Sequence, residues 1–345
     1  MKKLFLSVMV LSSSYFFAQE ATETEKATET EKKEKKFSFE GSVDAYYQSN
    51  LTSSDKAIFG ADGDAFQSFG TSFADETGFA LGMANIIAKY EGEKTGVVAD
   101  LVFGPRGDAA IGGYNLNQLY AYWNVTESTT LTLGRFNTYL GYEVISPTGN
   151  FNYSTSYLFS SGPFSHVGLK ADFALSDDFS LMLAVMNPTD VNNNYIGGYA
   201  FGAQLGYSGQ FLNFYYDDNE VLGFEIDYTG GFDVSDSFYL GLNAAYADND
   251  GEGFMGAAIY PQFAATDKFS IGLRGEYFDW LSDADTSVDD QDVLALTLTG
   301  SYTYEALTIK PELRLDSNSQ EVYADSDLES TKSFAAFTMA AIYQF

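Results

Sequence analysis

The chain has 345 residues, and its 48 Asp and Glu against 18 Lys and Arg give a formal net charge of −30. Aromatic residues make up 17% of it, the mean hydropathy is −0.14, and there is no Cys. So much aromatic surface excludes a disordered chain, the lack of Cys excludes disulfides and thiolate metal sites, and the acidic charge excludes nucleic acid as a partner.

Residues 1–18 have the order of a secretory signal peptide. Lys2 and Lys3 precede an apolar run over 4–11, and the stretch closes on the small residue Ala18. This order predicts cleavage after Ala18 and export. After residue 18 no run approaches the roughly 18 apolar residues that a membrane-spanning helix needs.

Residues 19–36 form a low-complexity charged segment that repeats Ala-Thr-Glu-Thr-Glu-Lys twice. Because it has no aromatic or branched apolar residue, it cannot bury a face, and we expect a solvated periplasmic tail. The tail is either a plain linker or a tether or plug for the folded domain that follows, residues 37–345.

From Phe37 onward, apolar and polar residues alternate, which is typical of strands with two different faces. In the first segment, Phe37, Phe39 and Val43 share one face, and Glu40 and Asp44 the other. The alternation recurs at 118–125, 166–173, 222–229 and 307–314. No stretch with helical periodicity is comparably long, so the fold class is all-β.

The lengths of the segments and connections favour a membrane barrel over a soluble sandwich. The segments run to roughly 9–12 residues, the length of a tilted membrane strand. Short connections lie near 91–95, 126–129, 175–178, 207–210, 232–236, 264–267 and 303–305. Long ones lie near 49–77, 104–116, 140–164, 187–198, 279–291 and 316–332. This predicts a transmembrane antiparallel up-and-down β-barrel of about 16 strands (about 14–18), with short periplasmic turns, longer external loops and a lumen wide enough for water.

The last alternating segment places four large residues on one face, Phe337, Met339, Tyr343 and the terminal Phe345. An aromatic C-terminal residue in such a strand resembles the signal by which the barrel assembly machinery recognises outer-membrane barrels. We therefore predict that these four residues form an assembly signal. The predicted location is the outer membrane of a Gram-negative bacterium, in contact with its lipid and lipopolysaccharide.

A family resemblance rests on residues 133–143 (LGRFNTYLGYE), 150–156 (NFNYSTS) and 168–170 (GLK). The residues that weigh most in it are Gly134, Phe136, Gly141, Tyr142, Glu143, Ser154 and Asn187. The stretch is similar to the beta-barrel porin-2 (OmpL-like) family, which implies a Gram-negative outer-membrane porin but says little about its solute. In general porins one long loop folds inward and narrows the pore. Residues 140–164 are the candidate for that loop, with an ordinary external loop as the alternative.

Charges of both signs fall on the predicted lumen side. We predict as pore-lining or constriction residues Arg135, Glu143, Lys170, Asp172, Arg274, Glu276, Lys310, Glu312 and Arg314. In a dry core each charge would cost several kcal/mol, which a water-filled lumen avoids. These residues either create a field that orders polar solutes or are paired charges that only stiffen the wall. We expect the constriction between 140–164 and the cations Lys170, Lys310 and Arg314, with Arg274 nearby.

Catalysis is not expected. His166 is the single histidine, which we expect to be solvated in the lumen or at its rim, and a hydrolase would need it with an acid and a nucleophile. The protein is therefore predicted not to be an enzyme.

An acidic loop is a candidate metal site, with no other cofactor expected. Asp283, Asp285, Asp289 and Asp290 could bind Ca²⁺ or Mg²⁺, with plain solubility charge as the alternative reading.

These observations predict an outer-membrane porin that allows passive diffusion of small hydrophilic solutes through a water-filled lumen. The alternative is a non-conducting structural or surface-binding outer-membrane barrel. A homotrimer is a candidate assembly, but no interface can be inferred from the sequence.

Overall fold

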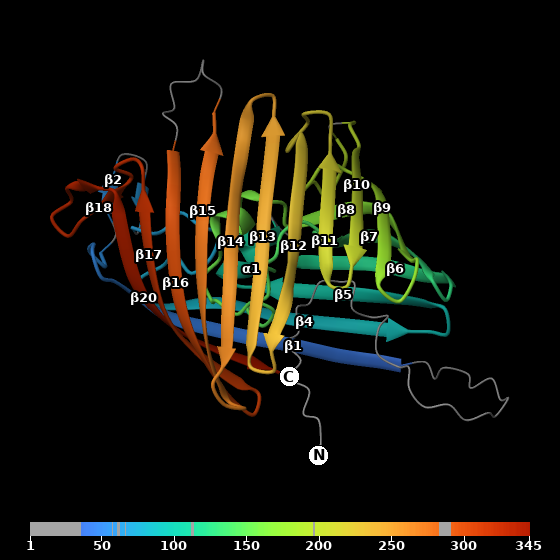
Figure 1. Ribbon diagram of the computed structural model, residues 1–345, viewed down its shortest axis with the longest axis horizontal. Coiled ribbons are helices and arrows are strands. Elements are labelled where there is room, and N and C mark those ends of the chain that lie inside the picture. The colour runs from blue at the N-terminus through green and yellow to red at the C-terminus, as the bar shows by residue number, and fades with distance from the viewer. Residues whose placement is uncertain are drawn as a thin grey trace.

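The computed structural model is a closed antiparallel β-barrel of 16 strands (Figure 1). It describes residues 36–56, 58–60, 63–65, 67–111, 114–195, 197–282 and 291–345. The predicted signal peptide (1–18), nearly all of the predicted tail (19–36) and the four candidate metal ligands at 283–290 lie outside the described residues. No helix among the described residues is long and apolar enough to cross a membrane.

The barrel strands are β1 (Lys36–Asn50), β4 (Gly78–Glu91), β5 (Thr95–Phe103), β6 (Leu116–Thr126), β7 (Thr129–Asn137), β8 (Ser165–Ala174), β9 (Phe179–Met186), β10 (Ala200–Tyr207), β11 (Gln210–Tyr216), β12 (Phe224–Ser235), β13 (Phe238–Asn249), β14 (Glu252–Ala264), β15 (Phe269–Leu281), β16 (Gln291–Tyr304), β17 (Leu307–Asn318) and β20 (Ser333–Gln344). Two small sheets lie in long connections: β2 (Ile58–Gly60) with β3 (Gly63–Ala65), and β18 (Tyr323–Ala324) with β19 (Ser330–Thr331). The helices are α1 (Pro105–Ile111), between β5 and β6, and α2 (Tyr157–Ser161), between β7 and β8.

Each barrel strand pairs with the barrel strands before and after it, and β20 pairs with β1 to close the ring. The predicted fold class is confirmed, with short turns at one end and longer connections at the other. One connection on the long side is nevertheless a tight hairpin, in which only Asp250 and Gly251 separate β13 from β14. Asp250 has a positive φ of 58°, a conformation in which Asp is one of the better tolerated residues.

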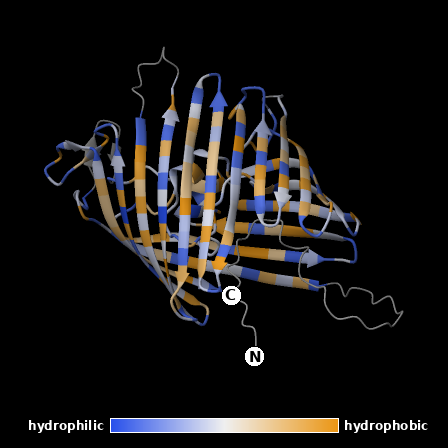
Figure 2. Ribbon diagram, viewed as in Figure 1, coloured by the Kyte–Doolittle hydropathy of each residue, from blue (hydrophilic) through white to orange (hydrophobic). Residues whose placement is uncertain are grey.

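The two faces of the strands differ as the alternation predicts. On β16, Leu294, Leu296 and Leu298 are 42–52% exposed on the outer face, whereas Thr297 and Thr299 point inward and are fully buried. Figure 2 shows the resulting alternation of apolar and polar bands along the strands. The exposed apolar face is the face that lipid would cover.

The C-terminal residue takes part in closing the barrel. The backbone N–H groups of Gly41 and Phe345 each donate to the carbonyl of the other, both at 2.9 Å, and the Phe345 ring lies over Gly41, where it leaves no room for a Cβ. Of the predicted assembly residues, Met339, Tyr343 and Phe345 are exposed on the outer face and Phe337 is partly buried. Their role in assembly stays a prediction.

Replacing Phe345 with Ser should lower the yield of folded barrel, because the ring over the β1–β20 seam is lost. The measurement is the amount of folded protein in isolated outer membranes. Gln344→Ser, which changes the neighbouring residue and keeps the terminal aromatic ring, is the control. Equal yields of the two variants and the wild type would show that Phe345 is not part of an assembly signal.

Candidate functional site

The connection between β7 and β8, residues 138–164, folds into the barrel, and we call it the inward segment. Its two ends lie together, since the Thr138 N–H donates to the Phe164 carbonyl at 3.1 Å. Between them the chain reaches the opposite wall, and Tyr153, Thr155 and Ser156 are at most 1% exposed. The sequence left open whether this connection is an external loop. In the structure it lies inside the lumen.

Arg274 of β15 is the main donor to the inward segment. Its Nη1 donates to Glu143 Oε1 and to the Ser154 carbonyl, both at 2.7 Å, and its Nη2 donates to the Thr155 carbonyl at 3.2 Å. The Arg274 side chain is completely buried. One guanidinium therefore neutralises the only carboxylate of the segment and satisfies two carbonyls that no regular secondary structure would satisfy.

Two carboxylates of the wall accept hydrogen bonds from the backbone of the inward segment. Glu276 of β15 accepts the N–H groups of Tyr157 at 3.0 Å and Leu158 at 2.8 Å, at the start of α2. Glu312 of β17 accepts those of Tyr153 at 2.7 Å and Ser154 at 3.0 Å. Irregular backbone has unpaired donors and acceptors, and here charged side chains of the wall pair with both kinds.

Two further cations on β17 complete this wall. Lys310 Nζ donates to the carbonyls of Asn150 at 2.5 Å and Pro147 at 3.2 Å. Arg314 donates to the Thr155 carbonyl at 2.9 Å and forms an ion pair with Asp316 at 2.8 Å. Both cations therefore contribute to holding the segment.

Three glycines on inward strand faces make room for aromatic rings of the inward segment. A Cβ on any of them would lie closer to the ring than non-bonded atoms can approach. The pairs are Gly202 with Tyr139, Gly241 with Tyr142, and Gly272 with Phe151. The wall is therefore shaped to the segment as well as hydrogen-bonded to it.

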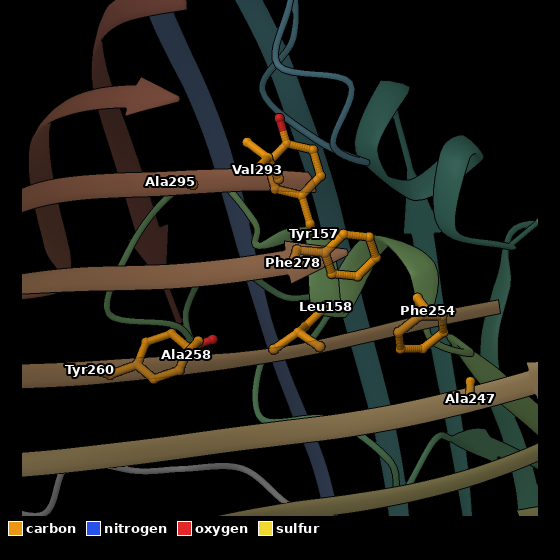
Figure 3. Close-up of a cluster of buried hydrophobic side chains, with 9 residues drawn as sticks. All are labelled: Tyr157, Leu158, Ala247, Phe254, Ala258, Tyr260, Phe278, Val293 and Ala295. Carbon is orange, nitrogen blue, oxygen red and sulfur yellow. The ribbon is translucent and has the colours of Figure 1, made fainter. Parts of the chain in front are cut away.

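Helix α2 anchors the segment through an apolar contact. Figure 3 shows Tyr157 and Leu158 of α2 among buried side chains of the strands, including Phe254 of β14 and Phe278 of β15. The Tyr157 hydroxyl donates to Asp316 at 2.8 Å. Burial raises the pKa of this hydroxyl well above its usual range, so Tyr157 donates as a neutral phenol.

The other wall also contacts the segment. Arg106 of α1 donates to the Ile145 carbonyl at 2.9 Å and lies 4.5 Å from the centre of the Phe73 ring. The Tyr153 hydroxyl donates to Asp44 of β1 at 2.6 Å. The inward segment thus crosses the lumen, with partners on β1 and α1 as well as on β15 and β17.

Six of the nine predicted pore residues meet at this site: Glu143, Arg274, Glu276, Lys310, Glu312 and Arg314. They are at most 5% exposed, so the expectation that water solvates these charges is wrong. The inward segment covers them, and its backbone and Glu143 supply the partners that water would have supplied. Whether they define the constriction stays a prediction.

The other three lie elsewhere. Lys170 and Asp172 pair with each other on β8 at 3.1 Å, and no described residue of the inward segment pairs with either. Arg135 of β7 is aligned in register with Leu119, which is half exposed on the outer face. Arg135 therefore belongs to the outer face of β7, where it donates to the Asn117 carbonyl at 3.0 Å and to the Asn192 side chain, and its assignment to the lumen is wrong.

His166 is buried, not solvated as expected. It is 1% exposed and lies on β8 in register with Phe136, and its Nε2 is 2.9 Å from Thr138 Oγ1 at the start of the inward segment. The ring packs beside Tyr139, at the start of the inward segment, and beside Tyr215 of β11.

The sequence reasoning missed several residues of the site, among them Asp44, Arg106, Tyr153, Tyr157 and Asp316. Alternation places Asp44 and Asp316 on the polar face, which could have identified them. Nothing in the sequence indicates that Arg106 would reach the inward segment. Among the described residues, no group of three or more potential metal-ligating side chains occurs.

Comparison with known proteins agrees with the barrel. The family described as "Putative beta-barrel porin-2, OmpL-like" matches residues 36–345. No curated protein matches the chain in sequence. Among solved structures, the outer membrane channel DcaP of Acinetobacter baumannii superposes with a TM-score of 0.58 at 13% identity, covering 90% of this chain and 97% of that one.

Two more solved structures have similar folds. An anion-selective porin from Comamonas acidovorans has a TM-score of 0.56 at 10% identity, covering 90% of this chain and all of that one. OprB of Pseudomonas putida has a TM-score of 0.55 at 10% identity, covering 90% of this chain and 94% of that one. At these identities the likeness establishes the fold.

Proposed function

The chain belongs to the beta-barrel porin-2 (OmpL-like) family, and on that premise we propose that the inward segment sets the size limit for the small hydrophilic solutes that diffuse through it. The protein is a porin of the Gram-negative outer membrane. The observation that carries the proposal is the fixation of residues 138–164 across the lumen by Arg274, Glu276 and Glu312.

The charged groups that contact the inward segment have both signs, with more anions than cations, which argues for weak ion selectivity there with a preference for cations. The cations are Arg106, Arg274, Lys310 and Arg314, and the anions are Asp44, Glu143, Asp190, Asp227, Glu276, Glu312 and Asp316. Paired charges of opposite sign leave little net field beyond a Debye length of about 8 Å. The strongly acidic chain should then give the mouths a mild preference for cations.

Purified protein in a planar bilayer under a KCl gradient should show stepwise conductance with a reversal potential that indicates mild cation preference. Complete absence of conductance by folded protein would support the non-conducting barrel instead. Strong anion selectivity would contradict the balance of charges around the segment.

We further propose that the barrel has no enzymatic role. The burial of His166 and its contact with Thr138 support a structural function for the single histidine. The proposed partners beyond small solutes are the barrel assembly machinery, lipopolysaccharide at the external loops, and two further copies in a homotrimer.

Binding of divalent cations by residues 283–290 is a separate proposal. If Asp283, Asp285, Asp289 and Asp290 bind Ca²⁺, millimolar Ca²⁺ should raise the melting temperature relative to chelator, since a ligand that binds the folded state stabilises it. The double variant Asp289→Asn/Asp290→Asn should reduce that shift. Equal melting temperatures in Ca²⁺ and in chelator would mean that these carboxylates serve only as solubility charge.

A further inference from the structure

We infer that the lumen contains a binding site for a neutral polyhydroxylated solute of hexose size, between the inward segment and the short-turn ends of β14, β16 and β17. The inference rests on the proposed function, because the ligand must enter through the barrel. It specifies the class of solute, which neither the family nor the fold does.

The site is a cavity of about 280 Å³. The inward segment forms one side of it with Tyr142 and Asn150, and the strands form the other with Tyr260, Gln262, Thr303 and Lys310. Its volume is close to the lower end of the roughly 300–1,000 Å³ typical of small-molecule sites. The cavity lies toward the short turns, since Thr303 is next to the end of β16 and Thr308, which also lines it, is next to the start of β17.

The cavity wall holds a buried acceptor that the protein leaves unused. Gln262 is only 7% exposed, and its Oε1 accepts no hydrogen bond from any described residue. An unsatisfied buried carbonyl costs about 1–3 kcal/mol unless a partner arrives. Gln262 lines the cavity, so a ligand hydroxyl would become such a partner once the side-chain amide turns to expose its oxygen, which no water-sized group reaches in the structure.

The charged groups that reach the cavity are already engaged. The Glu143 carboxylate accepts from Arg274 and from the Ser156 N–H and hydroxyl. Lys310 uses two of its three donors on the carbonyls of Pro147 and Asn150. Apart from the third donor of Lys310, what remains is amides and hydroxyls, which both donate and accept. That inventory matches a ligand made of hydroxyl groups better than an ion.

The aromatic wall fits the same class of ligand. The rings of Tyr142 and Tyr260 stack at a centroid distance of 4.3 Å, with an interplanar angle of 23°. Together with Phe151 they give the cavity apolar surface beside its polar groups. A pyranose presents C–H groups on its faces and hydroxyls at its edges, so it can use both kinds of surface at once.

The test uses glucose as a blocker of the KCl current through the full-length protein in a planar bilayer. We expect a saturable decrease of the current with glucose. Gluconate, of similar size but charged, should block at a concentration several-fold higher. Gln262→Leu should raise the half-blocking concentration of glucose about 5-fold, the effect of losing one hydrogen bond.

Two further variants make the result specific. In Gln210→Leu, on β11 and away from the cavity, glucose should block the current as in the wild type. Thr303→Val, at the exposed rim, should weaken the block without endangering the fold. A linear fall of current that only follows viscosity, tighter block by gluconate, or equal block in all variants would overturn the site. Loss of all conductance would instead overturn the proposed porin function.

Discussion

Replacing Arg274 with Met should release the inward segment and lower the free energy of unfolding by about 3–5 kcal/mol, the usual cost of removing one partner of a buried ion pair. The change leaves Glu143 buried without its cation and the Ser154 and Thr155 carbonyls without their donor. Denaturant unfolding in detergent measures the loss, and single-channel conductance should rise because the segment is no longer fixed.

Lys170→Met is the matched control, since the Lys170–Asp172 pair is partly exposed and should contribute less than about 1 kcal/mol. The double variant Arg274→Met/Glu143→Gln should recover part of the stability, because it removes the uncompensated carboxylate. If Arg274→Met and Lys170→Met had equal effects on stability and conductance, Arg274 would not hold the segment.

Removing the inward segment should have the largest effect on transport. The hydrogen bond between Thr138 and Phe164 shows that the two ends are adjacent, so a Gly-Ser linker of about five residues can replace residues 140–162 without moving β7 or β8. We expect a several-fold higher conductance and passage of larger sugars in liposome swelling.

The control for this deletion is a similar replacement of residues 326–329, the exposed tip of the hairpin formed by β18 and β19. It should leave conductance and the size limit unchanged. A size limit that stays the same after removal of 140–162 would mean that the passage is narrowed elsewhere in the barrel.

The fold was predictable because a barrel repeats one simple rule along the chain. Alternation assigns each strand residue to lipid or lumen, so positions such as Arg274 and Glu312 could be placed on the inner face from sequence alone. Arg135 was assigned to the wrong face because its charge was given more weight than the alternation. Leu133, two residues earlier on β7, already indicates the outer face for Arg135. The pairing of Arg135 with the exposed Leu119 confirms it.

The site was less predictable, because its partners come from segments that obey no periodicity. Glu143 could be singled out as the one carboxylate of a long connection, but its contact with Arg274 joins residues 131 positions apart. The charged side chains of the wall were expected to be solvated, because alternation shows only which residues face the lumen. It does not show that Tyr153, Ser154 and Tyr157 of the inward segment cover those side chains, because an irregular segment has no periodicity from which its path could be predicted.

The central claim is that residues 138–164 lie fixed across the lumen, and labelling a single cysteine tests it most directly. The chain has no Cys, so Ser154→Cys provides a unique thiol at a position that is 4% exposed. In intact outer membranes, a charged thiol reagent should label it far more slowly than Ser326→Cys on the exposed β18–β19 hairpin, and Arg274→Met should abolish that protection. Rapid labelling of Ser154→Cys in the otherwise unchanged protein would show that the segment is an external loop.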